Sequence, residues 1–210
     1  MHKFSLLFTP QPDATVANPS GNNLVLTYLE TIRFFGPDGT PCTGLDPDGS
    51  GFATFDGFPD LPVATYEGDG FGGAGPGGKR ISVDAEGLVL AKDGTFWVSD
   101  EYGPYIYRFN AVGVMIGAIR PPNVFIPMRN GTESFSANSP TFESGGEGDV
   151  VYPPNNPTGR QNNAGFEGLA ASGDGKTLFA LLQAATNNEG GLEKQTRRYV
   201  RRFIAVLANH

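Results

Sequence analysis

The 210-residue sequence has very few of the side chains that hydrolases commonly use for nucleophilic or zinc chemistry. Its histidines are His2 and His210, one near each end, and its single cysteine is Cys42. This composition argues against a Ser-His-Asp triad and a His-ligated zinc site, and it excludes a Cys-rich zinc site and an internal disulfide. The sequence also contains no Gly-x-Ser-x-Gly nucleophile motif and no Arg-His-Gly signature of histidine acid phosphatases.

Long apolar runs and an excess of positive charge are also missing. No stretch approaches the ~20 apolar residues of a membrane span, so we expect no contact with the membrane interior. The apolar run at residues 4–8 is shorter than the ~7–15 residues of a signal-peptide core, so we expect no secretion signal in this chain. The net charge of −7 argues against nucleic acid as a partner. It is compatible with binding a cation, or with binding an anion through a metal.

Glycine and proline, in contrast, are abundant, with 30 and 17 residues. They fall mainly in connecting stretches, whereas the segments between them are rich in aromatic and β-branched residues. This distribution is typical of short strands joined by many turns, and it predicts an all-β protein.

An internal repeat gives the main organisational result. Residues 84–98 (the first copy) can be laid over residues 165–180 (the second copy) with an offset of 81, which becomes 82 after an inserted residue at Lys176. Both copies contain Glu-Gly-Leu, a short strand, an Asp-Gly turn and a second strand, in that order. Because Asp-Gly between apolar runs is a strong hairpin signal, the sequence predicts two equivalent β-hairpins.

The first copy continues into two further predicted strands, at residues 105–109 and 114–119. Four antiparallel strands in series form one blade of a β-propeller. We therefore interpret residues 1–210 as one partial propeller domain of about two blades plus part of a preceding one. A propeller needs about four blades to close, so we expect the chain to be incomplete. The sequence predicts the end of a preceding blade and a connector at 20–67, and a blade with Glu86 at 80–120. A long inserted loop follows at 121–164, and an incomplete blade with Glu167 at 165–210. The third strand of this last blade is expected to begin near residues 198–200.

Two blocks of sequence, SDEYGPYIYRF at residues 99–109 and GFEGL at 165–169, resemble the phytase-like domain of fungi and bacteria, also called the esterase-like activity of phytase domain. The resemblance runs from about Leu24 to Arg201, and the tail at 202–210 does not look like the continuation of the family pattern. Members are usually secreted and longer, with further blades. The resemblance therefore implies a truncated β-propeller, an extracellular location, and hydrolysis of a phosphate or carboxylic ester.

Acidic residues at the repeats are the candidate metal ligands. Glu86 and Glu167 begin the first strand of each predicted blade, so they point towards the central channel from adjacent blades. Converging carboxylates repel one another unless their pKa values rise or a cation binds, and Ca²⁺ suits such oxygen ligands. Asp100 and Glu101 end the second strand and are expected to add ligands, while the second copy keeps only Gln183 there. The family resemblance also implies a channel metal; the alternative is that each Glu caps a turn.

Two weaker signals concern substrate and modification. Arg197 and Arg198 lie in a basic cluster with Arg201 and Arg202, which either binds a substrate phosphate or forms a solvated strand edge. Asn130-Gly131-Thr132 is a glycosylation sequon, which matters if the protein enters the secretory pathway.

Three functions remain open at this stage. The leading hypothesis is a metal-dependent hydrolase that acts on a small phosphate or carboxylic ester. The second is a non-catalytic binding propeller stabilised by calcium. The third is a fragment of a longer protein without function of its own, whose open sheet edges would favour pairing with other chains.

Overall fold

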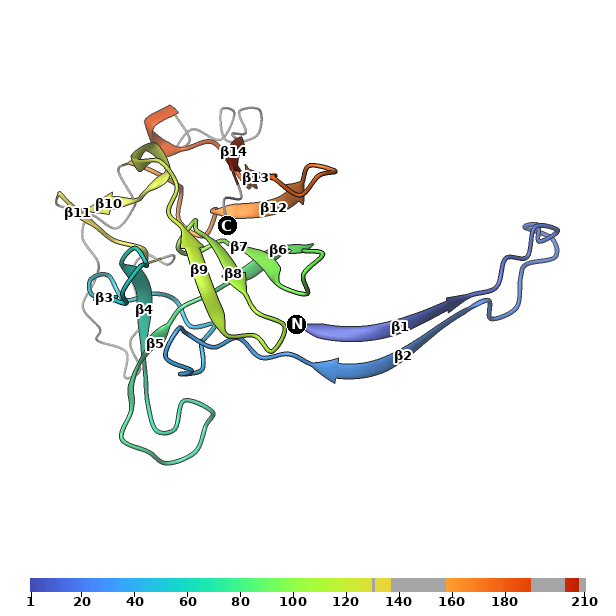
Figure 1. The fold of residues 1–210 in the computed structure, drawn as a ribbon, viewed down its shortest axis with the longest axis horizontal. Helices are drawn as coiled ribbons and strands as arrows, with labels where there is room; N and C mark the ends of the chain where they lie inside the picture. The colour runs from blue at the N-terminus through green and yellow to red at the C-terminus, as the bar shows by residue number, and fades with distance from the viewer. Residues whose placement is uncertain (130, 137–157, 190–202, 208–210) are drawn as a thin grey trace.

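The computed structural model describes residues 1–129, 131–136, 158–189 and 203–207. In these residues the chain forms β-strands and two short 3-10 helices, η1 (Asn123–Phe125) and η2 (Asn187–Glu189), with no α-helix (Figure 1). The predicted all-β class is thereby confirmed. None of the helices in this part of the chain is long and apolar enough to cross a membrane.

The strands of the described residues form five antiparallel sheets (Figure 1). Their members are, sheet by sheet, β1 (His2–Phe8) and β2 (Leu24–Thr31); β3 (Phe52–Ala53), β4 (Leu61–Tyr66) and β5 (Gly78–Ile81); β6 (Ala85–Leu90), β7 (Phe96–Asp100), β8 (Ile106–Phe109) and β9 (Met115–Ile119); β10 (Met128–Arg129) and β11 (Thr132–Glu133); and β12 (Phe166–Ala171), β13 (Thr177–Leu182) and β14 (Phe203–Leu207).

The four strands predicted between residues 84 and 119 are all present. They form one sheet in the sequential order β6-β7-β8-β9, as expected for a meander joined by short turns. All five residues of β7 are buried. Side-chain alternation along β7 places Phe96 and Val98 in one hydrophobic cluster and Trp97 in a second. The four-stranded sheet therefore lies between two cores.

The two copies of the repeat fold in the same way. Val89 pairs with Trp97 in the first hairpin, and Ala170 pairs with Phe179 at the equivalent places in the second. Each Asp-Gly turn places its glycine in the left-handed region, with φ of 84° at Gly94 and 74° at Gly175. Only glycine adopts this conformation without strain, which explains why both turns have it.

The third strand of the last sheet is described from Phe203 onwards. The expected start at residues 198–200 lies outside the described residues. The structure places β14 at Phe203–Leu207, antiparallel to β13. Ile204 and Val206 pack against the second hydrophobic cluster, which includes Phe166 and Leu178. Residues 203–207 of the tail are thus consecutive apolar residues that complete the sheet as its third strand.

The segments around the two copies contain further strands. The strand expected within residues 23–35 is present as β2, and it pairs with β1 in a long hairpin that projects from the body (Figure 1). The expected inserted loop at 121–164 includes η1 and the short β10–β11 hairpin. The boundaries proposed for the domain as a whole remain predictions.

Sheet β12–β13–β14 packs beside the four-stranded sheet through a close approach of β6 and β12. A Cβ atom added to Gly87 would lie 2.5 Å from the Cβ of Leu169 on β12 and 2.6 Å from its backbone nitrogen. Glycine is thus needed at position 87 to let the two strands meet. This contact brings the Glu-Gly-Leu segments of the two copies together.

Candidate metal site

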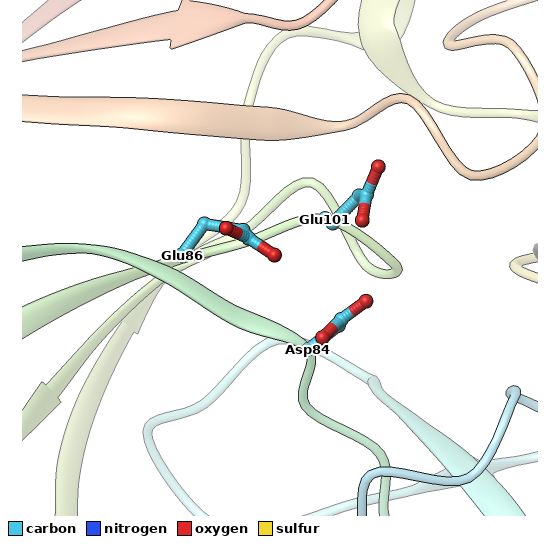
Figure 2. Close-up of side chains that lie close together, drawn as sticks. All are labelled: Asp84, Glu86 and Glu101. Carbon is cyan, nitrogen blue, oxygen red and sulfur yellow. The ribbon is translucent and has the colours of Figure 1, made fainter. Parts of the chain in front are cut away.

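Three carboxylates converge where β6 begins and β7 ends. Asp84 immediately precedes β6, Glu86 is the second residue of β6, and Glu101 immediately follows β7 (Figure 2). Each offers an oxygen, and these atoms all lie within 4.8 Å of one another. The backbone N–H of Glu101 donates a 3.0 Å hydrogen bond to the carbonyl of Asp84, which fixes the two chain segments side by side. We call Asp84, Glu86 and Glu101 the acidic cluster.

A β-bulge turns Glu86 out of the regular strand pairing. The ladder runs from Ala85 opposite Asp100 to Leu88 opposite Val98, so Glu86 and Gly87 are skipped. The N–H of Gly87 bonds to the hydroxyl of Ser99 instead, at 2.8 Å. The second hairpin has its irregularity at the equivalent place, between Phe166 and Gly168. Bulges commonly re-aim a side chain next to a functional site, and here each one carries the glutamate of Glu-Gly-Leu.

The environment of the cluster disfavours three negative charges. Glu101 is 5% exposed, and its Oε1 atom is buried without a hydrogen-bond partner among the described residues. Burial is the largest cause that raises the pKa of Glu101 to about 8, followed by the hydrogen bond and the negative charge of Asp84 and then by the charges of Glu167 and Glu86. Partial burial and the nearby Glu167 and Asp84 also raise the pKa of Glu86. A buried acceptor oxygen that lacks a donor, beside two further carboxylates, fits a bound cation.

The second copy resolves the same problem with a neutral group. Gln183 occupies the position equivalent to Glu101, and its Nε2 atom donates a hydrogen bond to Oε1 of Glu167. The residue equivalent to Asp84 is Gly165. A single carboxylate with an amide donor needs no cation. The two copies therefore share one fold but differ in their polar groups: the first holds three carboxylates, and the second pairs one carboxylate with an amide donor.

Asp100, which the sequence offers as a further metal ligand, makes hydrogen bonds to the backbone beside the cluster. Its side chain is fully buried and accepts hydrogen bonds from the N–H groups of Asp84 (2.9 Å), Tyr102 (3.1 Å) and Gly103 (3.0 Å). It also accepts one from the hydroxyl of Tyr107, at 3.2 Å. Burial raises the pKa of Asp100, the hydrogen bonds lower it, and the net result is a pKa of about 7. Because side chains alternate along β7, Asp100 faces inward and Glu101 faces the cluster. Asp100 therefore holds the backbone that carries Asp84 and Glu101.

Of the residues that the sequence singled out, the structure brings together Glu86 and Glu101, with Glu167 close enough to raise both of their pKa values. Asp84 was missed. The signal that would have found it is the difference between the copies, since Asp84 and Glu101 are replaced by Gly165 and Gln183. The candidate substrate residues Arg197 and Arg198 and the sequon residue Asn130 lie outside the described residues.

The donor set of the acidic cluster matches a hard divalent cation. All donors are oxygens, and no histidine or cysteine is a member. Ca²⁺ accepts six to eight oxygens in flexible geometry, including carbonyls and water, so three carboxylates provide a sufficient nucleus for a site. The cluster is therefore suited to Ca²⁺ rather than to a softer metal.

Comparison with known proteins agrees with this structure. Residues 16–208 match the phytase-like family, described as esterase-like activity of phytase. The match extends beyond Arg201, where the resemblance was expected to end. The chain is 55% identical over 202 residues to an uncharacterized secreted protein of Arthroderma benhamiae, covering 96% of this chain and 39% of that relative. No solved structure matches the chain. The chain belongs to the phytase-like family.

Proposed function

We propose that the chain forms part of a calcium-dependent β-propeller hydrolase that acts on a phosphate or carboxylic ester. The observation that carries this proposal is the acidic cluster, in which the Oε1 atom of Glu101 is buried and has no hydrogen-bond partner among the described residues. Family membership indicates the ester chemistry, and the repeated antiparallel sheets support the propeller. The chain spans well under half of the relative's length, so the activity proposed is that of the longer protein.

Each residue of the cluster has a separate part in this proposal. Asp84, Glu86 and Glu101 bind the cation, and Asp100 fixes the backbone of two of them. Glu167 lies next to the site and adds negative charge, which strengthens the attraction for a cation. A bound divalent cation supplies charge neutralisation for an ester or phosphate oxygen and lowers the pKa of a bound water. Arg197 and Arg198 are further candidates for contacting a substrate phosphate.

We also propose that the protein works outside the cell. The Arthroderma benhamiae relative is described as secreted, and the sequon at Asn130 would be glycosylated on that route. Calcium at extracellular concentrations, which are in the millimolar range, would fill even a weak site with Kd of about 10⁻⁴–10⁻³ M.

The test combines calcium binding with turnover, both measured on the longer protein to which the activity is assigned. We expect calorimetry to detect Ca²⁺ binding, and hydrolysis of p-nitrophenyl phosphate or p-nitrophenyl acetate to stop after treatment with EGTA and to return with Ca²⁺. Glu86→Gln should weaken calcium binding at least about tenfold. The matched control is Asp56→Asn, which removes one exposed charge outside the cluster. Turnover that persists unchanged in EGTA would contradict the proposed chemistry.

A second function is favoured by one feature of the site. Gly165, at the start of β12, packs so tightly on Glu101 that an added Cβ would lie 2.6 Å from the Glu101 carbonyl carbon. The cluster thus lies at the junction of two sheets, where a cation would stabilise the packing without catalysis. This alternative, a calcium-stabilised binding propeller, predicts a calcium-dependent melting temperature and no turnover of either ester.

A further inference from the structure

The β1–β2 hairpin exposes apolar side chains along its whole length. Every residue of both strands is exposed, and within the described part of the chain the two strands pair only with each other. The hairpin projects away from the body that contains the other sheets (Figure 1). An isolated two-stranded hairpin is at best marginally stable in water, so this element requires a partner surface.

One face of the hairpin is apolar except at its end next to the body, where the His2–Thr31 pair lies. Three directly opposed pairs lie on it: Phe4 with Tyr28, Leu6 with Leu26, and Phe8 with Leu24. Their exposed fractions range from 50% to 62%. The rings of Phe4 and Tyr28 meet edge to face at 5.8 Å, so the surface is also preorganised. We call these six residues the hairpin face.

We propose that the hairpin face binds the hairpin face of a second copy of this chain, forming a two-fold symmetric dimer. A two-fold axis near the central Leu6–Leu26 pair would place the same residues on both sides, as an isologous interface requires. The two hairpins would then pack as facing sheets, with the side chains of Leu6 and Leu26 from both copies at the centre.

The charge distribution favours a second copy at this place. The chain carries a net charge of −7, so most of its surface repels another copy. The two strands contain only Lys3 and Glu30 as charged residues besides His2, and these two form an ion pair with each other at 3.0 Å. Neither belongs to the hairpin face. The projection of the hairpin also keeps the acidic bodies apart.

The available area agrees with a dimer. Six large side chains, each about half exposed, offer roughly 600 Å² of apolar surface, taking ~200 Å² for a fully exposed large side chain. Leu7 and Val25 oppose each other on the other face of the hairpin, so they add nothing to this area. A standard interface buries about 800 Å² on each partner. The hairpin face thus offers about three quarters of the surface that such an interface buries.

Analytical ultracentrifugation of the full chain tests the proposal. We expect the wild-type chain to sediment as a dimer at micromolar concentration, and Leu26→Lys to raise the dimer Kd at least about tenfold. The matched control is Leu90→Lys, which places the same charge on an apolar residue that is 71% exposed outside the hairpin, and it should leave the dimer intact. A wild-type chain that stays monomeric at 100 μM (roughly the upper end of such measurements), or equal weakening by both variants, would overturn the proposal.

Hydrogen exchange of the wild-type chain gives a second test that does not depend on a variant. Dilution from dimer to monomer should speed exchange at amides of β1 and β2 and leave those of β7 unchanged. If dilution instead speeds exchange only in another part of the chain, the copies meet at a different surface. That result would rule out the hairpin as the interface.

Discussion

Glu101 and Gln183 occupy equivalent positions and show how a single side chain determines the chemistry at a junction. Each follows the second strand of its hairpin, and each lies near the bulged glutamate of its own copy. The amide of Gln183 donates to Glu167, whereas Glu101 has no proton to donate once it is ionised. The proposal that the first copy binds a cation rests on this difference.

Glu101→Gln should therefore give the first copy the amide donor that the second copy has, while Asp84 and Glu86 remain. We expect the calcium-free variant to melt at a higher temperature than the wild type, because a buried carboxylate is replaced by a neutral donor to its neighbours. We also expect Ca²⁺ to raise the melting temperature of the wild type but not that of the variant. Thermal unfolding with and without Ca²⁺ measures both effects. A calcium response that survives in the variant would exclude Glu101 as a ligand.

Asp100→Asn tests whether Asp100 supports the site from behind. One of its oxygens would become an NH₂ group, which cannot accept the hydrogen bond from the N–H of Gly103. We expect a loss of about 1–3 kcal/mol in the calcium-free free energy of unfolding. Calcium affinity should also fall about 10–100-fold, as for other supporting residues of metal sites. Urea unfolding and calcium titration measure the two effects.

The sign of the first effect separates the two roles. If Asp100 were instead a ligand in the cluster, removing its charge would relieve repulsion and stabilise the calcium-free protein. If Asp100→Asn stabilises the calcium-free protein, Asp100 is a metal ligand rather than a support for the backbone.

At the scale of elements, the sequence predicted the hairpins well because their determinants are local. Asp-Gly turns, alternation and strand length specified β6–β9 and the hairpin of β12 and β13. The bulges were not predicted, because a bulge depends on how a strand pairs and packs rather than on its own residues. Asp84 was missed for the same reason: its contact with Glu101 is made across the sheet. The inward orientation of Asp100 follows from a strand register that the sequence left open.

Gly87→Ala tests the close approach of β6 and β12. The added methyl group would overlap with Leu169, so the two sheets must separate. We expect a loss of about 1–3 kcal/mol in the free energy of unfolding, the usual cost of overpacking a tight contact. Urea unfolding measures it.

Gly173→Ala is the matched control for this substitution. An added Cβ at Gly173 meets nothing within 4 Å. The change should therefore be close to neutral, and an equal loss at both positions would show that packing between the sheets is not the cause.

At the scale of the whole molecule, the acidic cluster lies where two sheets meet that share one hydrophobic cluster. Glu167 belongs to one sheet and raises the pKa of Glu86 and Glu101, which belong to the other. Without a cation, this like-charge interaction opposes the packing of the two sheets. With a cation, the same charges favour it.

Glu167→Gln should consequently raise the melting temperature of the calcium-free chain and reduce the further rise that Ca²⁺ produces. For a chain of this size, each kcal/mol gained corresponds to about 2–4 °C. Calorimetric scans in EGTA and in Ca²⁺ provide the measurement, with Asp56→Asn again as the charge control. A calcium-free variant that melts at or below the wild-type temperature would show that repulsion between the sheets is negligible.

The equivalence of Glu101 and Gln183 has a genetic consequence. Codons for glutamate and glutamine differ in their first base, so one nucleotide change can add or remove one carboxylate at such a junction. In a protein assembled by duplication of a single hairpin, ion sites can thus be gained or lost at successive junctions without altering strand pairing, turns or packing. The number of bound ions in such a lineage is free to drift while the fold stays the same.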